Sequence, residues 1–284
     1  MGAELTAFSK PLLCAYNRKG GKKPQSARKG KEPMPTIYLS PSMQEWNPTV
    51  TDRTEEYNMN LIADAMEPYL FSSGIRYLRN TPDMTAALAI QESNAGQYDL
   101  HLALHSNAAP EQEAGSRRGT EVYYARGSTW GQKAAEIIAR NLKQIYPLPD
   151  QVRALPTTTL GEVIKTHAPA VLIEFAYHDN LDDALWIEEN IQAIARNVVL
   201  SLTEYFGIPF VEPQVPQIGY VSTLGGNLNL RRFPDTSAPI LARLSNGLPL
   251  LIRGSWKDWY VVDANGQIGY VSAEYVSKAS PSVS

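Results

Sequence analysis

The chain has 284 residues, of which 43% are hydrophobic and 19% are charged, and its formal net charge is -3. This length allows one sizeable domain and a second, smaller one, and the composition is that of a globular protein. No run of residues approaches the roughly 18 consecutive apolar residues of a membrane-spanning helix, which excludes insertion into a membrane.

Charge is distributed unevenly along the chain. Residues 1–33 hold eight of the 26 basic side chains and two of the 29 acidic ones, which leaves 18 basic and 27 acidic groups, a net charge of -9, in the remainder. Because the negative net charge of residues 34–284 repels a phosphate backbone, nucleic acid is not an expected partner.

The basic leader at residues 1–33 has two interpretations. It is a localisation signal or a nucleic-acid-binding arm, or it is not native protein and translation begins at Met34. We favour the second, because Lys31 and Glu32 can be encoded by a sequence that resembles a bacterial ribosome-binding site. In both cases we expect the leader to be disordered, and it lacks the apolar core of a secretory signal.

The only cysteine, Cys14, lies in this leader. We therefore expect the folded part of the chain to contain no thiol nucleophile, no cysteine zinc site and no disulfide. Any metal bound there must use His, carboxylate or amide ligands.

From residue 37 the apolar pattern alternates between strand and helix. Strands are predicted at residues 37–40, 75–79, 100–105, 121–124 and 171–175, and helices at residues 54–71, 84–94, 129–146 and 181–206. Asp52 with Glu55 is typical of a capping box at the start of the first helix. This alternation predicts an α/β fold with a mostly parallel sheet covered by helices on both faces. Functional sites in such folds lie at the carboxyl ends of the strands.

The sequence pattern changes from alternating strands and helices to short strands and turns after Gly207. Three prolines within residues 209–216 indicate a linker, and short strands punctuated by glycine turns follow at residues 217–279, which predicts a small all-β barrel before a tail at 280–284. The first domain is then residues 34–208. The hexapeptide QIGYVS occurs at 217–222 and again at 267–272, and we interpret the first copy as the remnant of a longer array of modules.

Two apolar segments run directly into polar groups that bind metal or transfer protons. They are DLHLALHSN at residues 99–107 and VLIEFAYHDN at residues 171–180. A single buried histidine is usually part of a core, but two strands that both end in this way favour a site. His105 is then a metal ligand and Glu174 a general base.

A hydrolytic zinc site needs three protein ligands and an open position for water. His105 supplies one nitrogen, and Glu56 in the first turn of the helix at 54–71 supplies a carboxylate, whereas Glu55 is interpreted as stabilising the helix N-terminus. Glu174 would take a proton from the attacking water and return it to the leaving amine. Such a site cleaves an amide.

These segments resemble the zinc-dependent N-acetylmuramoyl-L-alanine amidases, which cut the bond between muramic acid and the peptide stem of peptidoglycan. The resemblance covers residues 37–206 and rests on four ordered motifs: a Glu four residues before an Asn, matched by Glu56 and Asn60; DLHLALHSNA at 99–108; GTEVYY at 119–124; and PAVLIE at 169–174, followed by Asn180. The resemblance implies zinc as cofactor, Glu174 as the catalytic residue, and peptidoglycan as partner. It also suggests substrate contacts for Asn107, Arg79 and Asn180.

One departure from the family concerns its first zinc-binding histidine. In place of that motif this chain has SPSMQE at residues 40–45. Met43 takes the position of the histidine but binds zinc poorly, so we rank the amide of Gln44 first as the third ligand. His178 is a further candidate, His101 is expected in the core, and His167 is expected to contact substrate.

The C-terminal segment resembles bacterial SH3-like domains. The matching residues are LNLR at 228–231, PDTS at 234–237, Trp259 with Tyr260, and GYVS at 269–272. Such modules often bind peptidoglycan peptides, which agrees with an amidase. Trp259 is expected in the barrel core, whereas Trp256 or Tyr270 is expected to contact the wall.

Three functions compete. We favour a peptidoglycan amidase that acts outside the cell or in the wall after export by lysis or a non-classical route. The alternative is a degenerate domain that binds cell wall or muropeptide without cutting it, which the missing histidine favours. A zinc carboxypeptidase is a third hypothesis, but the Arg-rich signature for a terminal carboxylate is absent from the sequence.

Overall fold

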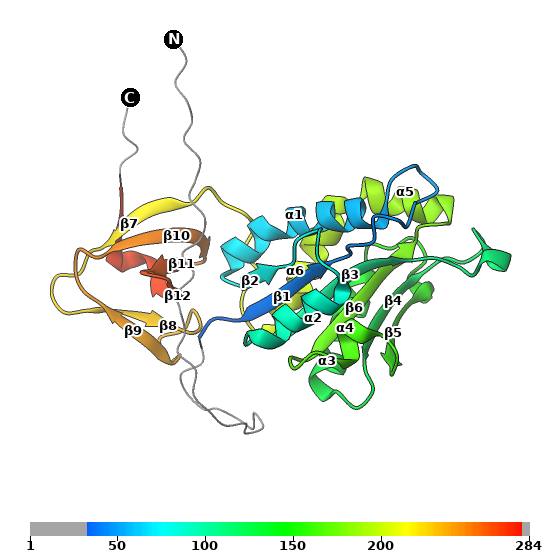
Figure 1. Cartoon of the computed structure of the whole chain (residues 1–284). Helices are drawn as coiled ribbons and strands as arrows, with labels where there is room; N and C mark the ends of the chain where they lie inside the picture. The colour runs from blue at the N-terminus through cyan, green and yellow to red at the C-terminus, as the bar shows by residue number, and fades with distance from the viewer. Residues whose placement is uncertain (1–32, 280–284) are drawn as a thin grey trace, which may run out of the picture.

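The computed structural model describes residues 33–279, so the predictions about the leader and the tail lie outside the described residues. A six-stranded sheet forms the first domain, in the order β2-β1-β3-β6-β4-β5 (Figure 1). Its strands are β1 (Thr36–Pro41), β2 (Arg76–Arg79), β3 (Leu100–Asn107), β4 (Thr120–Ala125), β5 (Val152–Thr157) and β6 (Ala170–Tyr177). All neighbouring pairs are parallel except β4 with β6, so the predicted mostly parallel α/β sheet is confirmed.

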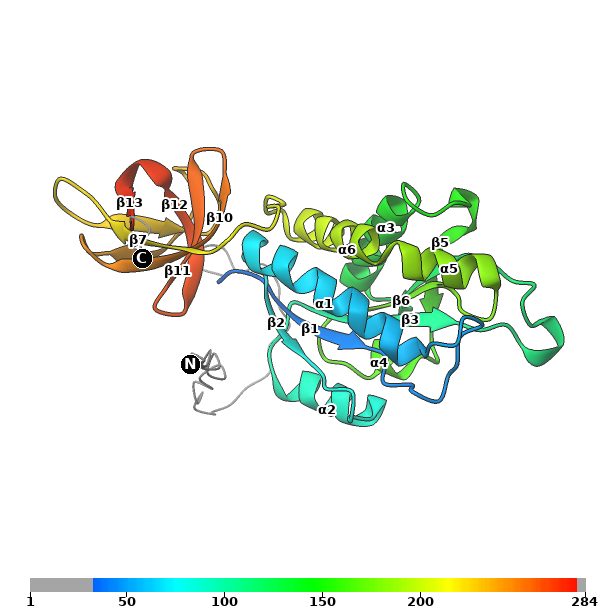
Figure 2. The ribbon, with the colours of Figure 1, turned by 90° about the horizontal axis from the view of Figure 1, so that it is seen from above.

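Helices cover both faces of this sheet, and Figure 2 shows α6 and α3 on one side and α2 on the other. The larger layer consists of α1 (Glu55–Ser73), α3 (Thr129–Leu142), α5 (Leu181–Glu189) and α6 (Ile191–Phe206). The smaller layer consists of α2 (Ala86–Ala95) and the short α4 (Gly161–Ile164). Alternate strand residues divide between the layers, so Leu39 and Leu104 join the main core beneath α1, whereas His105 and Glu174 face the α2 and α4 side.

The start of α1 and one strand differ from the sequence-based expectations. Thr54, not Asp52, is the N-cap of α1, and its side chain accepts a hydrogen bond from the backbone N–H of Tyr57; Asp52 instead has a positive φ of 63°. Strand β5 was not predicted, because Pro156 interrupts its pattern and it lies at the edge of the sheet, where proline is tolerated.

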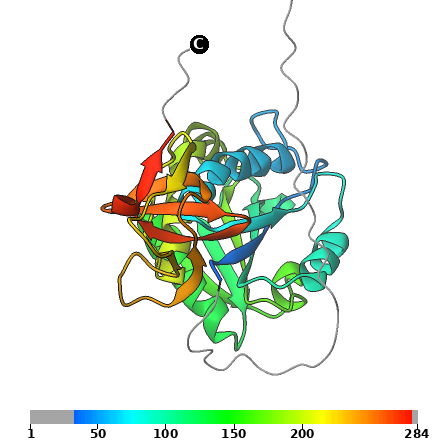
Figure 3. The same cartoon turned by 90° about the vertical axis from the view of Figure 1, so that its left-hand side faces the viewer.

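The second domain is a seven-stranded, all-antiparallel barrel-like sheet with the order β13-β7-β10-β11-β12-β8-β9, seen in front of the first domain in Figure 3. Its strands are β7 (Gln217–Val221), β8 (Leu228–Arg231), β9 (Ile240–Leu244), β10 (Pro249–Trp256), β11 (Trp259–Ala264), β12 (Gln267–Ser272) and β13 (Val276–Lys278). Short 3-10 turns lie at Glu111–Glu113, Pro149–Gln151 and Ala273–Tyr275.

The two identical hexapeptides form β7 and β12 of this one domain, so the first copy is an integral strand of the barrel; its origin as the remnant of a longer array stays a prediction. Their environments differ. Ile218 and Tyr220 are 47% and 42% exposed, whereas the equivalent Ile268 and Tyr270 are 5% and 0% exposed. The second copy is buried because it packs into the same apolar cluster as the first domain, beside Met34.

The barrel is attached closely to the end of α1. The guanidinium of Arg253, at a bulge in β10, lies 3.9 Å from the ring centroid of Phe71, and the Ser73 hydroxyl accepts from the Val211 backbone N–H at 3.1 Å. Burial lowers the pKa of Arg253 to about 10. The junction is therefore a packed interface and not a loose tether.

Gly254 in β10 allows this close approach. A Cβ added there would lie 2.9 Å from the backbone oxygen of Ser72 and 2.7 Å from Val211 Cγ1. Gly254→Ala is therefore expected to reduce the free energy of unfolding by roughly 1–3 kcal/mol, as overpacking does. Chemical denaturation measures this, with Gly225→Ala as control because a Cβ at Gly225 meets nothing within 4 Å. Equal stability of the two variants would contradict a tight junction.

Within residues 33–279, no helix has the length and apolar character needed to cross a membrane.

Candidate active site

His105 and Glu174 lie next to each other at the carboxyl ends of β3 and β6. They are direct partners in the register of these strands, and Glu121 of β4 is the partner of Glu174 on its other side. The structure therefore brings together the two residues that the sequence singled out. It adds a second carboxylate to the same row.

The imidazole of His105 lies between two carboxylates. Its Nδ1 is 2.8 Å from Glu55 Oε1, and its Nε2 is 3.1 Å from Glu162 Oε2. Burial by itself lowers the pKa of His105, but the hydrogen bonds with Glu162 and Glu55 outweigh burial and raise it well above its usual range. The two carboxylates therefore favour the protonated form of the imidazole.

Glu55, and not the predicted Glu56, is the carboxylate of α1 that reaches the site. Glu55 lies four and seven positions before Met59 and Ile62, so it shares their buried face of the helix, and it is 1% exposed. Glu56 lies one position further round the helix, where its carboxylate accepts from Asn60 Nδ2 at 3.2 Å. The spacing of the apolar residues that follow was the signal that would have identified Glu55.

Gln44, Glu55 and His105 lie at the corners of a triangle, and each carries an atom that can bind a metal; we call this set the donor triangle. Its Nε2 is 3.4 Å from His105 Nδ1 and 3.5 Å from Glu55 Oε1, and its Oε1 accepts from Asn47 Nδ2 at 3.1 Å. A half-turn of the amide, at the expense of the bond from Asn47, points the oxygen at the same spot. Among the described residues no three His, Cys, Asp or Glu side chains form a metal-binding group, so the donors available to a zinc ion here are His105, Glu55 and the amide of Gln44. These donors fit zinc, with one nitrogen fewer than the family pattern.

Glu174 is partly buried, and its Oε2 is shielded from solvent without a hydrogen-bond partner among the described residues. Burial raises the pKa of Glu174 to about 7; His105 lowers it, and the negative charges of Glu55, Glu121 and Glu162 raise it. An unpartnered carboxylate with a pKa near neutrality is suited to accept and return a proton.

A cleft of about 600 Å³ opens above these groups. Its floor includes Gln44, His105, Glu162 and Glu174, and Lys165 is the cation in its lining. Its walls are largely apolar and are formed by Met43, Trp46, Met84, Ile90, Leu160 and Leu172. Trp46 is 70% exposed, so the cleft offers an aromatic surface beside the polar floor.

Three residues expected to contact substrate lie outside the lining of this cleft. Arg79 binds Asp64 and Glu67 of α1, with Nη1 to oxygen distances of 2.6 and 2.9 Å. Asn180 is the N-cap of α5, and the backbone N–H of the exposed His167 donates to a side chain of α2. All three make contacts within the fold, and their predicted contacts with substrate stay predictions.

Asn107 and the remaining histidines have polar partners. Asn107 Nδ2 donates to Glu121 Oε2 at 3.2 Å, beside the row of carboxylates. His178 Nδ1 contacts Ser106 Oγ at 2.8 Å, away from the donor triangle. His101 is fully buried, as expected, and is stacked on Tyr38.

Glu162 is the site residue that sequence reasoning missed. It lies in α4, a helix of four residues that was not predicted, and it is 5% exposed. Burial raises the pKa of Glu162, but contacts with His101 and His105 bring it well below its usual range. The only sequence signal was a lone carboxylate between apolar residues in the segment before β6.

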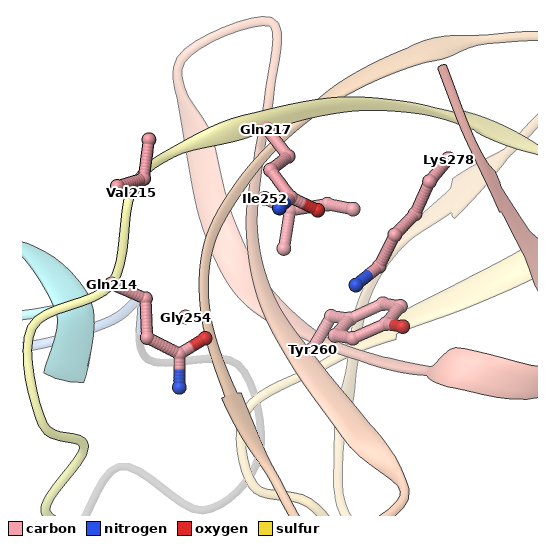
Figure 4. Close-up of a pocket in the computed structure, with 7 residues that line it drawn as sticks. All are labelled: Gln214, Val215, Gln217, Ile252, Gly254, Tyr260 and Lys278. Atoms are coloured by element: carbon pink, nitrogen blue, oxygen red, sulfur yellow. The ribbon is translucent and has the colours of Figure 1, made fainter. Parts of the chain in front are cut away.

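A second pocket, of about 380 Å³, lies between the linker and the barrel (Figure 4). Lys278 lies over the ring of Tyr260, 5.1 Å from its centroid, and Gln214 from the linker accepts a hydrogen bond from Ser255. Unlike the cleft, this pocket is lined by no carboxylate or histidine. Tyr270 was expected to contact the wall, but it is fully buried in the apolar cluster that it shares with the first domain.

Comparison with known structures supports the fold. The amidase AmiC2 of Nostoc punctiforme is 15% identical with a TM-score of 0.54, and the match covers 63% of this chain and 99% of that one. An N-acetylmuramoyl-L-alanine amidase from Clostridium difficile 630 is 17% identical with a TM-score of 0.55, covering 62% and 98%. The catalytic domain of CwlV from Bacillus (Paenibacillus) polymyxa var. colistinus is 16% identical with a TM-score of 0.54, covering 62% and 100%.

Family models identify both parts of the chain. The model for N-acetylmuramoyl-L-alanine amidase matches residues 41–204, and the model for the bacterial SH3 domain matches residues 226–277. No curated protein matches the chain. The chain therefore belongs to the N-acetylmuramoyl-L-alanine amidase family, a class of hydrolases, and it carries a bacterial SH3 domain after its amidase part.

Proposed function

We propose that this protein hydrolyses the amide between N-acetylmuramic acid and L-alanine in peptidoglycan. The observation that carries the proposal is the adjacent placement of His105 and the unpartnered Glu174 on the floor of the cleft. The family match supports the same bond as the target.

Gln44, Glu55 and His105 would hold a zinc ion through an amide oxygen, a carboxylate oxygen and Nδ1. Bound there, zinc supplies a Lewis acid that polarises the amide carbonyl and acidifies water. Glu174 removes a proton from the attacking water, and the resulting carboxylic acid protonates the departing nitrogen. The products are a muramic acid carboxylate and a peptide with a free L-alanine amino group.

The environment of the cleft supports the assignment of roles. The apolar walls reduce the access of water to Glu174, which keeps its pKa near neutrality. We propose that Asn107, held by Glu121 beside this row, contacts the substrate. Trp46 at the rim offers a ring against which a sugar or peptide face packs.

We propose that the SH3 domain holds the enzyme on the cell wall, and that the protein acts outside the cell or in the wall after release by lysis or a non-classical route. Because Tyr270 and Ile268 are buried, the wall would contact the exposed part of β7, with Ile218 and Tyr220, and the pocket in Figure 4. The packed junction near Gly254 then fixes the cleft relative to that surface.

The full-length chain is expected to bind about one zinc ion and to release L-alanine amino termini from purified peptidoglycan. His105→Ala removes the only nitrogen donor of the triangle and is expected to lose both zinc and activity. His167→Ala is the matched control for zinc content, because this exposed histidine lies outside the cleft. Metal analysis and an assay for new amino groups measure the two effects. Failure of the wild type to release amino termini from several wall types with zinc present would leave a wall-binding protein without this activity.

A further inference from the structure

Glu162 occupies a position on the far side of His105 from the donor triangle. Its Oε2 is 3.1 Å from His105 Nε2, whereas Glu55 and Gln44 both lie on the Nδ1 side of the ring. The two ring nitrogens thus have different neighbours. Only Nδ1 faces the point on which the donors converge.

The carboxylate of Glu162 is itself held in place. Its Oε1 accepts a hydrogen bond from Ser40 Oγ at 2.6 Å. His101 Nε2 lies 3.4 Å from the same oxygen, without hydrogen-bonding geometry. Ser40 belongs to β1, directly before the loop that carries Gln44. The segment that lacks a zinc-binding histidine therefore supplies both an amide donor and the anchor for Glu162.

A carboxylate on one nitrogen of an imidazole determines what the other nitrogen does. With zinc held at Nδ1, the proton that remains on the ring would be on Nε2, which donates to Glu162, and the lone pair of Nδ1 would face the metal. The negative charge also makes Nδ1 a stronger donor. Gln44 is neutral, so Glu55 is the only anionic donor in the triangle, and a second carboxylate behind the imidazole increases the attraction for a divalent cation.

We propose that Glu162 is a positioning residue for the metal site, which orients His105 and strengthens its Nδ1 as a zinc donor where the chain has an amide in place of a second imidazole. This inference rests on the proposed function. Ser40 acts one step further out by holding the carboxylate of Glu162.

The test measures zinc affinity by competition with a chromophoric chelator for the full-length wild type and for Glu162→Gln. The amide has nearly the same shape but no charge, so zinc affinity is expected to fall by about 10- to 100-fold. Ser40→Ala, which keeps the carboxylate but removes its anchor, is expected to show a smaller loss in the same direction. Glu92→Gln is the matched control, because Glu92 accepts from Tyr38 on the same side of the sheet without touching His105.

The visible spectrum of the Co²⁺ form separates positioning from simple stabilisation. A change in the band positions for Glu162→Gln but not for Glu92→Gln supports the proposal, as does partial recovery of zinc affinity in Glu162→Asp, which restores the charge. Unchanged or tighter zinc binding by Glu162→Gln, with the wild type binding zinc, overturns the role of Glu162 and leaves the proposed function intact. A wild type that binds no zinc overturns both.

Discussion

Glu174→Gln is expected to lower the rate of L-alanine amino-terminus release from peptidoglycan by about 10²- to 10⁴-fold, the usual contribution of a general acid–base group. Glutamine fills the same space but neither accepts the proton of the attacking water nor protonates the leaving nitrogen. Glu174 lies outside the donor triangle, so the zinc content is expected to equal that of the wild type. Single-turnover assays beside metal analysis measure both quantities. Loss of zinc together with activity would assign Glu174 to the metal and not to proton transfer.

The pH profile provides a sharper version of this test. As a base, Glu174 must be ionised, so activity is expected to rise with pH through the range set by its pKa of about 7; the charge of bound zinc moves that limb to lower pH. Glu121→Gln is the matched variant, one strand away in register. The variant removes the negative charge of Glu121, which raises the pKa of Glu174. The pKa of Glu174 is therefore expected to fall, and the acidic limb of the pH profile is expected to move further toward lower pH. A shift toward higher pH would contradict Glu174 as the base.

Local patterns were sufficient to predict much of the site. The apolar runs of β3 and β6 predicted two buried strands, and their polar ends predicted a site at the carboxyl edge of the sheet. Parallel pairing then places His105 beside Glu174. These inferences succeed because burial on both faces of a central strand is recorded in its own residues.

The parts that failed depend on contacts between distant segments or on helix phase. Glu56 was preferred over Glu55 because it lies four residues before Asn60, as in the family motif, although Glu55 shares the helical phase of the buried Met59 and Ile62. Glu162 reaches His105 across 57 positions of sequence from a helix too short to have periodicity. Tyr270 was expected on a wall-binding surface, but its burial depends on the first domain, which a motif of one module does not record.

Gln44→His is expected to tighten zinc binding, because it restores an imidazole to the first segment of the site. Both side chains place a donor atom four bonds from Cα, and imidazole nitrogen is a stronger zinc ligand than a neutral amide oxygen. Gln44→Ala removes the third donor, and its zinc affinity is expected to fall by at least about tenfold, the lower end of the loss when an outer partner is removed. Competition with a zinc chelator ranks the three chains.

Gln91→His is the control for the histidine variant, because Gln91 is exposed on α2 and lies outside the lining of the cleft. If zinc affinity falls in the order His, Gln, Ala at position 44, the amide occupies the position of a ligand. If the side chain only packed near the metal, zinc affinity would not follow the donor strength of the residue. Equal affinity for all three would place the metal elsewhere, and the 3.4 Å between Gln44 Nε2 and His105 Nδ1 would then be an ordinary polar contact. That order would also explain how a family member without its first histidine could keep a working site, because a weaker third donor would suffice as long as Glu55 and His105 keep their positions.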